Sequence, residues 1–215
     1  MKITWFGHAC FKLVSDSGVV VITDPFDETV GYRLPNEQAD VVTVSHQHFD
    51  HNYVQGIRGN PEVVDKIGNF YIKDISIKGV KSYHDDQGGS KRGINIIYVL
   101  YIDGIKVCHL GDLGHALSND QVEQIGKVDV LLIPVGGTYT IGASTAANVV
   151  SSLKPSIVIP MHYKTDKVHF PIDGVDKFLE VMGGGNYLNS HTLEVKKEDV
   201  DSKETRVLVL EYKSH

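Results

Sequence analysis

Residues 41–51 read VVTVSHQHFDH, a short apolar strand that continues directly into a histidine-rich segment. In an extended chain, residues i and i+2 project to the same side, so His46 and His48 can offer imidazole nitrogens to one ion. A turn then brings Asp50 and His51 towards a second ion beside the first. Three imidazoles and one carboxylate within six residues match the ligands of a divalent transition metal. The segment therefore predicts a metal site at the carboxyl end of a buried strand.

An approximate internal repeat organises the chain around this segment. Residues 11–26 followed by 39–48 resemble residues 98–114 followed by 127–137, since each half has a strand, a glycine turn, a strand that ends in aspartate, and a further buried strand. Two β-rich halves with helices between them predict an α/β fold of the αββα type, with two sheets packed face to face and helices outside. No proline-rich linker or low-complexity segment interrupts the chain, so we expect one domain over residues 1–215.

Hydrophobic periodicity indicates the individual elements. Residues that alternate between polar and β-branched or aromatic types indicate strands, and apolar residues that recur every three or four positions indicate helices. The expected strands are 2–7, 10–15, 18–23, 41–45, 70–77, 94–101, 105–109, 129–133, 156–159 and 206–211. The expected helices are 61–67, 119–126, 144–153 and 174–182.

Composition narrows the class of protein. The 215 residues carry 21 basic and 27 acidic side chains, a formal net charge of −6, which argues against a general electrostatic grip on nucleic acid. The longest apolar runs, such as 19–22 and 130–133, are strand-sized, so we expect no membrane span. The first residues lack the apolar segment of a signal peptide, and Cys10 and Cys108 are too few for a disulfide framework. We therefore expect a cytoplasmic protein.

Three further candidate ligands follow other expected strands, namely His84 in SYHDDQGG, Asp112 in HLGDLGH and His162 in IVIPMHYKT. Taken singly, they could be a loop histidine, a turn aspartate and a core histidine. Together with HQHFDH they occur in the order of the metallo-β-lactamase superfamily, whose H-x-H-x-D-H signature the segment 46–51 resembles. WFGHACFKL, TDPF, PVGG and PMHYKT resemble a small cytoplasmic branch of that superfamily, related to the ascorbate-6-phosphate lactonase group and N-acyl-phosphatidylethanolamine phospholipase D.

The resemblance implies both a fold and a ligand set. The fold would be the metallo-β-lactamase αββα sandwich of two mixed β-sheets. The site would hold two divalent metal ions, zinc by default, although imidazole-rich sites also accept manganese, iron, cobalt or nickel. The resemblance implies that three imidazoles hold one ion, namely His46, His48 and His84. A carboxylate and two imidazoles would hold the second ion, namely Asp50, His51 and His162. The carboxylate of Asp112 would bridge the two ions.

Two adjacent dications would lower the pKa of a shared water towards neutrality, so that hydroxide becomes the nucleophile while the ions act as Lewis acids. Asp112 or Asp50 would orient this hydroxide and could take its proton. The resemblance also places His8, in the first expected hairpin, near the metals as a substrate-binding or proton-transfer residue. The alternative for His8 is a structural histidine of the hairpin.

Other residues are candidates for holding the ligating imidazoles in place. Asp24 matches the first motif of the superfamily and would accept a hydrogen bond from a ligating histidine, unless it is only a turn residue before Pro25. His109 precedes Asp112 and would support the loop that carries it.

Substrate contacts are predicted from position alone. Tyr139 and Lys164 follow expected strand ends and are candidates for contacting the substrate. His115 belongs either to the wall of the site or to the surface. Lys91 and Arg92 could meet an anionic group of the substrate, but we expect them to lie in a solvated loop.

The sequence thus predicts a dinuclear metal-dependent hydrolase that acts on a small ester-like molecule, with a phosphodiester or a lactone favoured over a β-lactam. One alternative is a nuclease acting on RNA or DNA, against which the absence of a basic surplus argues. Another is a metal- or ligand-binding domain without turnover. We expect a small-molecule substrate and no membrane partner, and a homo-oligomer is possible.

Overall fold

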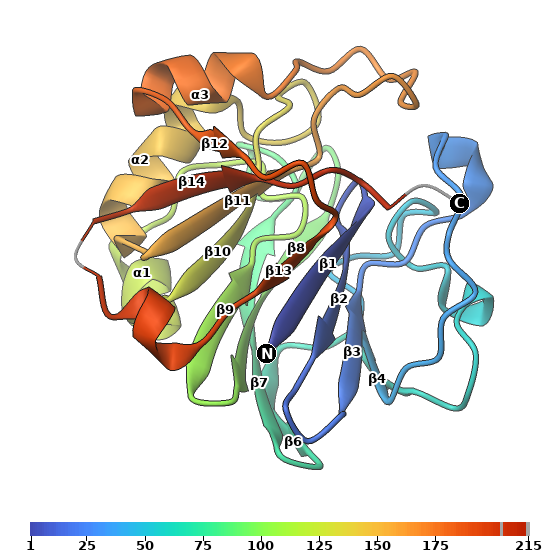
Figure 1. Cartoon of the computed structure of the whole chain (residues 1–215). Helices are drawn as coiled ribbons and strands as arrows, with labels where there is room; N and C mark the ends of the chain where they lie inside the picture. The colour runs from blue at the N-terminus through green and yellow to red at the C-terminus, as the bar shows by residue number, and fades with distance from the viewer. Residues whose placement is uncertain (203, 214–215) are drawn as a thin grey trace.

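Two β-sheets face each other across the interior, and Figure 1 shows their layered arrangement. The computed structural model describes residues 1–202 and 204–213. Within these residues one sheet, which we call the N-terminal sheet, has six strands in the order β13-β1-β2-β3-β4-β5. They are β1 (Lys2–Gly7), β2 (Cys10–Val14), β3 (Val20–Thr23), β4 (Val41–Thr43), β5 (Glu62–Val64) and β13 (Thr192–Glu194).

The second sheet has, over the described part of the chain, eight strands in the order β12-β14-β11-β10-β9-β8-β7-β6. Each sheet contains antiparallel pairs, such as β1–β2 and β7–β8, and parallel pairs, such as β3–β4 and β10–β11. The predicted sandwich of two mixed sheets is therefore confirmed. The strands are β6 (Gly68–Ile72), β7 (Ile75–Tyr83), β8 (Ile94–Ile102), β9 (Ile105–His109), β10 (Val130–Pro134), β11 (Ile157–Met161), β12 (Asn186–Tyr187) and β14 (Arg206–Val209).

Alternate side chains of facing strands fill the space between the sheets, because successive residues of a strand point to opposite faces. Phe11 and Leu13 of the N-terminal sheet share one buried cluster with Tyr98 and Leu100 of the second sheet. Cys10, the residue before Phe11, belongs to a separate cluster on the outer face of the N-terminal sheet. The chain thus buries both faces of this sheet.

The two outer faces are covered differently. The helices α1 (Asn119–Ile125), α2 (Ala143–Leu153) and α3 (Asp176–Met182) lie on the outer side of the second sheet in Figure 1. Loops that carry the 3-10 turns η1 (Glu28–Val30) and η2 (Val54–Gly56) cover the N-terminal sheet, where Phe26 and Val30 pack in one cluster with Ile22. A third 3-10 turn, η3, spans Lys197–Val200. None of the helices within the described residues has the length and hydrophobicity that crossing a membrane requires.

Two of the expected element bounds need correction. The helix expected over 61–67 is wrong, because Glu62–Val64 forms β5 and pairs in parallel with β4. The single strand expected over 70–77 is two strands, β6 and β7, separated by a turn in which Lys73 has a φ of 54°. In the first place, pairing with the distant strand β4 decides for a strand over a helix; in the second, the turn at Lys73 folds the run back on itself as a local hairpin.

A buried tyrosine connects the second sheet to the N-terminal sheet beside the histidine-rich segment. The hydroxyl of Tyr98, on β8, lies 3.0 Å from the carbonyl oxygen of Val44 and 2.8 Å from that of Val64, and can donate to either. Since Val44 follows β4 directly, this contact holds the start of the segment 46–51 against the second sheet.

Replacing this hydroxyl should therefore destabilise the fold. We expect Tyr98→Phe to lower the free energy of unfolding by about 1–2 kcal/mol, because a buried carbonyl loses its donor. Urea unfolding followed by circular dichroism measures the change. Tyr101→Phe is the matched control on the same strand, since Tyr101 is 51% exposed. Equal stability of Tyr98→Phe and Tyr101→Phe would contradict the prediction.

Candidate metal centre

The carboxyl ends of strands from both sheets meet at one edge of the sandwich. The strands β1, β3 and β4 run in one direction in the N-terminal sheet, and β7, β9 and β11 do so in the second sheet. A hydrogen bond from the Ile96 amide to the Ser45 carbonyl, 2.9 Å long, joins the sheets there. The residues that follow these strands are His8, Asp24, the segment 46–51, His84, Asp112 and His162.

These residues form three groups whose ligand atoms lie within 4.8 Å of one another, and each group is able to hold a metal ion. The three groups are continuous, since the last shares one histidine with each of the others. They are His46, His48 and His84; His8, Asp50, His51 and His162; and His46, His51 and Asp112. The structure therefore brings together all seven side chains predicted as ligands, from segments far apart in the sequence.

Asp112 lies at the centre of this arrangement. Its Oδ2 is 3.1 Å from His84 Nε2, 3.2 Å from His51 Nε2 and 3.3 Å from His162 Nε2. It is also 3.9 Å from His46 Nε2. Burial raises the pKa of the Asp112 carboxyl, but the surrounding imidazoles outweigh burial and hold the pKa well below its usual range. A buried carboxylate with several imidazole nitrogens around one oxygen is suited to binding a metal ion.

The polar atoms that face this centre support the same assignment. Among the described residues, Asp112 Oδ1, His46 Nε2 and His51 Nε2 are buried without a hydrogen-bond partner. Unpartnered buried polar atoms are costly and rare in folded proteins. Imidazole nitrogens and carboxylate oxygens are ligands for zinc and similar ions, so the donor set fits the metal ions that the resemblance implies.

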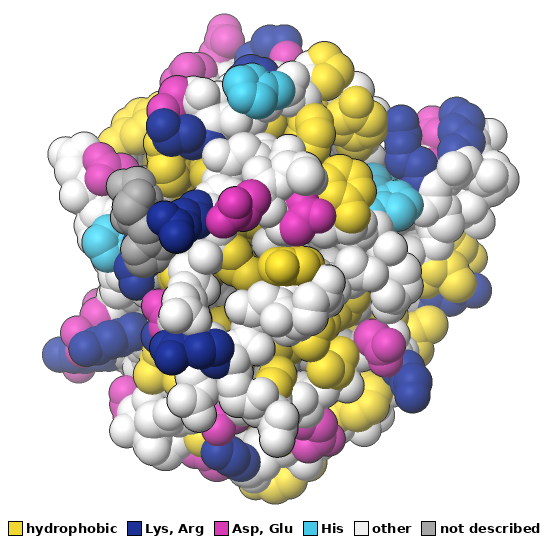
Figure 2. Space-filling model, turned by 90° about the vertical axis from the view of Figure 1, so that its right-hand side faces the viewer, with side chains coloured by type: hydrophobic (Ala, Val, Ile, Leu, Met, Phe, Trp, Pro, Cys, Tyr) yellow, Lys and Arg dark blue, Asp and Glu magenta, His cyan; other side chains and the backbone are white. Residues whose placement is uncertain are grey.

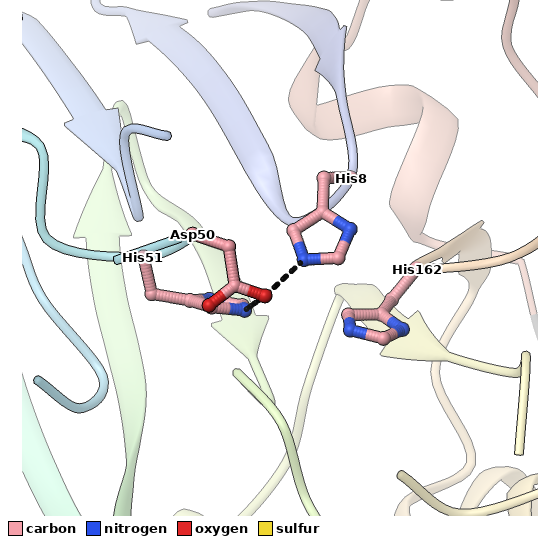
Figure 3. A group of neighbouring side chains, drawn as sticks. All are labelled: His8, Asp50, His51 and His162. Atoms are coloured by element: carbon pink, nitrogen blue, oxygen red, sulfur yellow. Dashed lines mark hydrogen bonds and ion pairs between the residues drawn. The ribbon is translucent and has the colours of Figure 1, made fainter. Parts of the chain in front are cut away.

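His8 lies closer to the predicted ligands than the sequence analysis anticipated. Its Nε2 is 3.2 Å from Asp50 Oδ2, and its ring lies 4.1 Å from the His162 ring, centroid to centroid. Figure 3 shows Asp50 between His8 and His51, with His162 on the other side of His8. Burial, together with the nearby His162, lowers the pKa of His8 to about 4, so its imidazole is neutral at neutral pH. His8 is therefore an additional candidate ligand.

Asp24 controls the orientation of two predicted ligands. Its carboxylate accepts hydrogen bonds from His51 Nδ1 at 2.9 Å, the Ser45 amide at 2.8 Å and the Ser45 hydroxyl at 2.5 Å. Because the Ser45 hydroxyl gives its hydrogen to Asp24, its oxygen is left to accept from His46 Nδ1, 2.9 Å away. Both imidazoles then direct Nε2 towards Asp112. This is the role predicted for Asp24, and Ser45 was not anticipated.

His109 also occupies a supporting position. Its Nε2 lies 2.8 Å from the Ala9 carbonyl oxygen, and its Nδ1 accepts a hydrogen bond of 3.2 Å from the Gly111 amide. One neutral tautomer satisfies both contacts, and burial lowers the pKa of His109 and favours this neutral form. The ring thereby joins the first hairpin to the loop that carries Asp112.

Asn95 is a supporting residue that the sequence analysis missed. Its Oδ1 accepts a 2.9 Å hydrogen bond from the Asp112 amide, and its Nδ2 donates to the Leu110 carbonyl at 2.9 Å. Gly111 is required beside it, since its φ is 55° and a Cβ there would lie 2.4 Å from Asn95 Oδ1. The sequence feature that could have indicated this role is that Asn95 is a single polar amide within the otherwise apolar run 94–100.

A cavity of about 370 Å³ opens onto the metal ligands. Tyr139 lines it, as proposed for a substrate contact, and Arg92 lines it instead of lying only in a solvated loop. Phe49 and Phe170, which were not anticipated, complete its aromatic wall. The lining residues are His48, Phe49, Asp50, His84, Arg92, Asp112, Tyr139, His162 and Phe170.

The other two substrate candidates have different surroundings. The Lys164 ammonium group is exposed and donates a 3.0 Å hydrogen bond to the Phe170 carbonyl, outside the lining of the cavity. His115 lies in neighbouring hollows, where its Nε2 accepts a 3.1 Å hydrogen bond from the Tyr83 amide. Position after a strand end was too coarse a criterion to separate these residues from Tyr139.

Comparisons with known proteins agree with this geometry. The Beta-lactamase superfamily domain matches residues 2–162 of the chain. A UPF0173 protein of Pyrococcus furiosus is 33% identical over 183 residues, which cover 77% of this chain and 84% of that protein. A UPF0173 metal-dependent hydrolase of Methanosphaera stadtmanae is 31% identical over 220 residues, covering 84% and 89%. The crystal structure of a proposed Zn-dependent hydrolase of the metallo-β-lactamase superfamily from Thermotoga maritima is 44% identical, with a TM-score of 0.81 and 98% of each chain covered.

Removing the charge of Asp24 should weaken metal binding, because His51 Nδ1 loses its carboxylate acceptor and the Ser45 hydroxyl, which orients His46, loses its own. We expect Asp24→Asn to raise the dissociation constant for zinc about 10- to 100-fold. Competition with a chromophoric chelator measures the affinity. Asp120→Asn, an exposed substitution at the start of α1, is the control. Wild-type affinity in Asp24→Asn would show that Asp24 does not orient the ligands.

Metal uptake should also depend on pH. Burial lowers the pKa of His51, but Asp112, Asp50 and Asp24 outweigh burial and raise it well above 6.5 in the metal-free protein. Below that raised pKa, His51 carries a proton that must leave before its nitrogen can bind an ion. We therefore expect apparent zinc affinity to fall as pH falls, by up to about tenfold per unit for each proton released.

Calorimetric titration with zinc, in buffers of different ionisation enthalpy at pH 6, 7 and 8, measures the protons released. His191→Gln, which removes an exposed histidine, should leave this number unchanged. Affinity independent of pH over this range would contradict the prediction.

Proposed function

This chain belongs to the metallo-β-lactamase superfamily and is a metal-dependent hydrolase, and we propose that it holds two divalent ions and cleaves a small ester-like substrate. The observation that carries the proposal is the continuity of the three ligand groups through Asp112. One ion would be held by His46, His48 and His84, and the other by Asp50, His51 and His162. Zinc is our default because the set combines imidazoles with carboxylates.

The surrounding residues support hydrolysis rather than storage of metal. Two divalent ions in this site would act as Lewis acids on the substrate and would make hydroxide available at neutral pH. Asp50 lines the cavity and is held by His8 at 3.2 Å, so its carboxylate is placed to orient a water molecule and to take its proton. Burial raises the pKa of Asp50, but His51 and His8 outweigh burial and keep the carboxyl ionised.

The size of the cavity favours a small molecule. A volume of about 370 Å³ lies at the lower end of the range typical of small-ligand sites. A phosphodiester or a lactone is favoured over a β-lactam, in keeping with a cytoplasmic location. The free, buried thiols of Cys10 and Cys108 are consistent with that location.

A nuclease is the less favoured alternative. On the face shown in Figure 2, dark blue and magenta side chains are interspersed, and the net charge of the chain is −6. Proteins that grip nucleic acids usually gather basic residues into a patch or stripe. A small substrate therefore suits this chain better than a polynucleotide.

Turnover should require both metal and Asp112. We expect exhaustive chelation to abolish hydrolysis of phosphodiesters, lactones, thioesters or β-lactams, and the addition of zinc, manganese, iron, cobalt or nickel to restore it for at least one class. Asp112→Asn should lower kcat at least about 100-fold, because the shared ligand loses its charge. In Asp112→Asn, the metal content measured by mass spectrometry should fall below two ions per chain.

The control is Asp120→Asn, which should retain wild-type turnover and metal content. Stoichiometric metal with no hydrolysis of any substrate class would instead favour a binding domain without catalysis. Salt-sensitive binding of a generic oligonucleotide, with cleavage, would favour the nuclease.

A further inference from the structure

Arg92 stands at one end of a row of aromatic rings that leads to the metal ligands. Its guanidinium carbon lies 5.4 Å from the centroid of the Tyr139 ring. The Tyr139 ring meets the Phe170 ring edge to face, with centroids 6.2 Å apart, and the Phe170 ring meets the His8 ring at 6.1 Å. His8 in turn lies 4.1 Å from the ring of His162. Arg92, Tyr139, Phe170 and His162 all line the cavity, and His8 packs behind the last two.

Backbone hydrogen bonds hold Arg92 in this position. The carboxylate of Asp85, directly after His84, accepts from the amides of Gln87 and Gly89 through Oδ1, each at 2.8 Å. Its Oδ2 accepts from the amides of Lys91 at 2.9 Å and Arg92 at 2.8 Å. The loop from the metal ligand to Arg92 is therefore fixed around one anion.

The guanidinium is free to bind an anion. Within residues 1–202 and 204–213, it makes no hydrogen bond or ion pair, and only its amide is engaged, by Asp85. The neighbouring Lys91 instead forms an ion pair, with its Nζ 3.7 Å from Asp86 Oδ1, and both of these side chains are mostly exposed. The carboxylates that share the cavity with Arg92 are Asp50 and Asp112, which are both predicted metal ligands. A planar guanidinium stacked on an aromatic ring keeps its N–H edge available for two parallel hydrogen bonds.

We propose that Arg92 binds a second anionic group of the substrate, a carboxylate or a phosphate, separate from the bond that is cleaved. The part of the substrate between the two groups is flat or apolar and lies along Tyr139 and Phe170, facing Phe49, which is 53% exposed. The substrate class is thus a small amphipathic anion. This inference rests on the proposed function only for the nature of the bond that reacts.

The test uses non-hydrolysable probes, so that it does not depend on turnover. The probes are phenylphosphonate and its 3- and 4-carboxy derivatives, titrated calorimetrically into zinc-loaded protein. We expect the better carboxylated probe to bind wild-type protein at least tenfold more tightly than phenylphosphonate does. Arg92→Ala should reduce this ratio to less than twofold and leave the binding of phenylphosphonate within twofold of wild type.

Two further variants separate a specific contact from general charge. Arg92→Lys should retain only part of the preference, because an ammonium group cannot make the paired hydrogen bonds of a guanidinium. Lys91→Ala removes one positive charge from the same loop and should leave the ratio unchanged. Circular dichroism and zinc content establish that each variant is folded and loaded.

The inference is overturned if wild-type protein shows no preference for the carboxylated probes, or if Arg92→Ala retains it. Failure of the proposed function has a different signature, namely loaded protein that hydrolyses no member of the substrate panel. Loss of the preference in Arg92→Ala would support the anion site even in that case.

Discussion

The burial of one carboxylate among imidazoles is the constraint on which the rest of this site depends. Asp112 has a negligible exposed surface, and its Oδ2 lies within 3.9 Å of four Nε2 atoms. An anion so placed must be compensated by positive charge, which protons on the surrounding imidazoles or a bound metal ion can supply. The imidazoles follow strands of both sheets, so the site is complete only where the two sheets pack together. The hydrogen bonds of Tyr98, Asn95 and His109 all serve to hold these sheet edges in register.

Local strain accompanies this assembly. His8, Asp24 and His162 have φ angles of 51°, 40° and 51°, in the left-handed region that residues other than glycine seldom adopt. Each such residue costs roughly 1 kcal/mol or more and persists only where its surroundings over-determine it. The 3.1 Å hydrogen bond from the His162 amide to the His8 carbonyl shows one such surrounding contact. These conformations lower the free energy of unfolding, and they give the three side chains directions that regular strands do not provide.

The parts of the site that could be predicted from sequence are those encoded in short segments. HQHFDH after an apolar strand indicated a metal site, because a strand end fixes where its next residues project. His84, Asp112 and His162 are single residues after later strands, and their order, which resembles that of the superfamily, marked them as ligands. The roles of Asn95 and Ser45, and the contact between His8 and Asp50, depend on segments that are distant in sequence, which no local pattern contains. The same limit explains β5, whose residues are compatible with a helix until β4 lies beside them. Lys164 and Tyr139 follow strands in the same way and differ only in three-dimensional neighbours.

The Asp85 loop has a consequence for how such a scaffold can diversify. Its shape is held by backbone amides around a carboxylate, with glycine required at Gly89, so the path of the loop does not depend on the side chain of Arg92. Substitution of Arg92, which lines the cavity, can change what the cavity accepts without displacing His84, whose position is set by β7 and the neighbouring strands. Selectivity and metal chemistry are thereby carried by adjacent but mechanically separate parts of the chain. An ancestral hydrolase built in this way could acquire new substrates through drift in one loop while its reaction centre stayed intact.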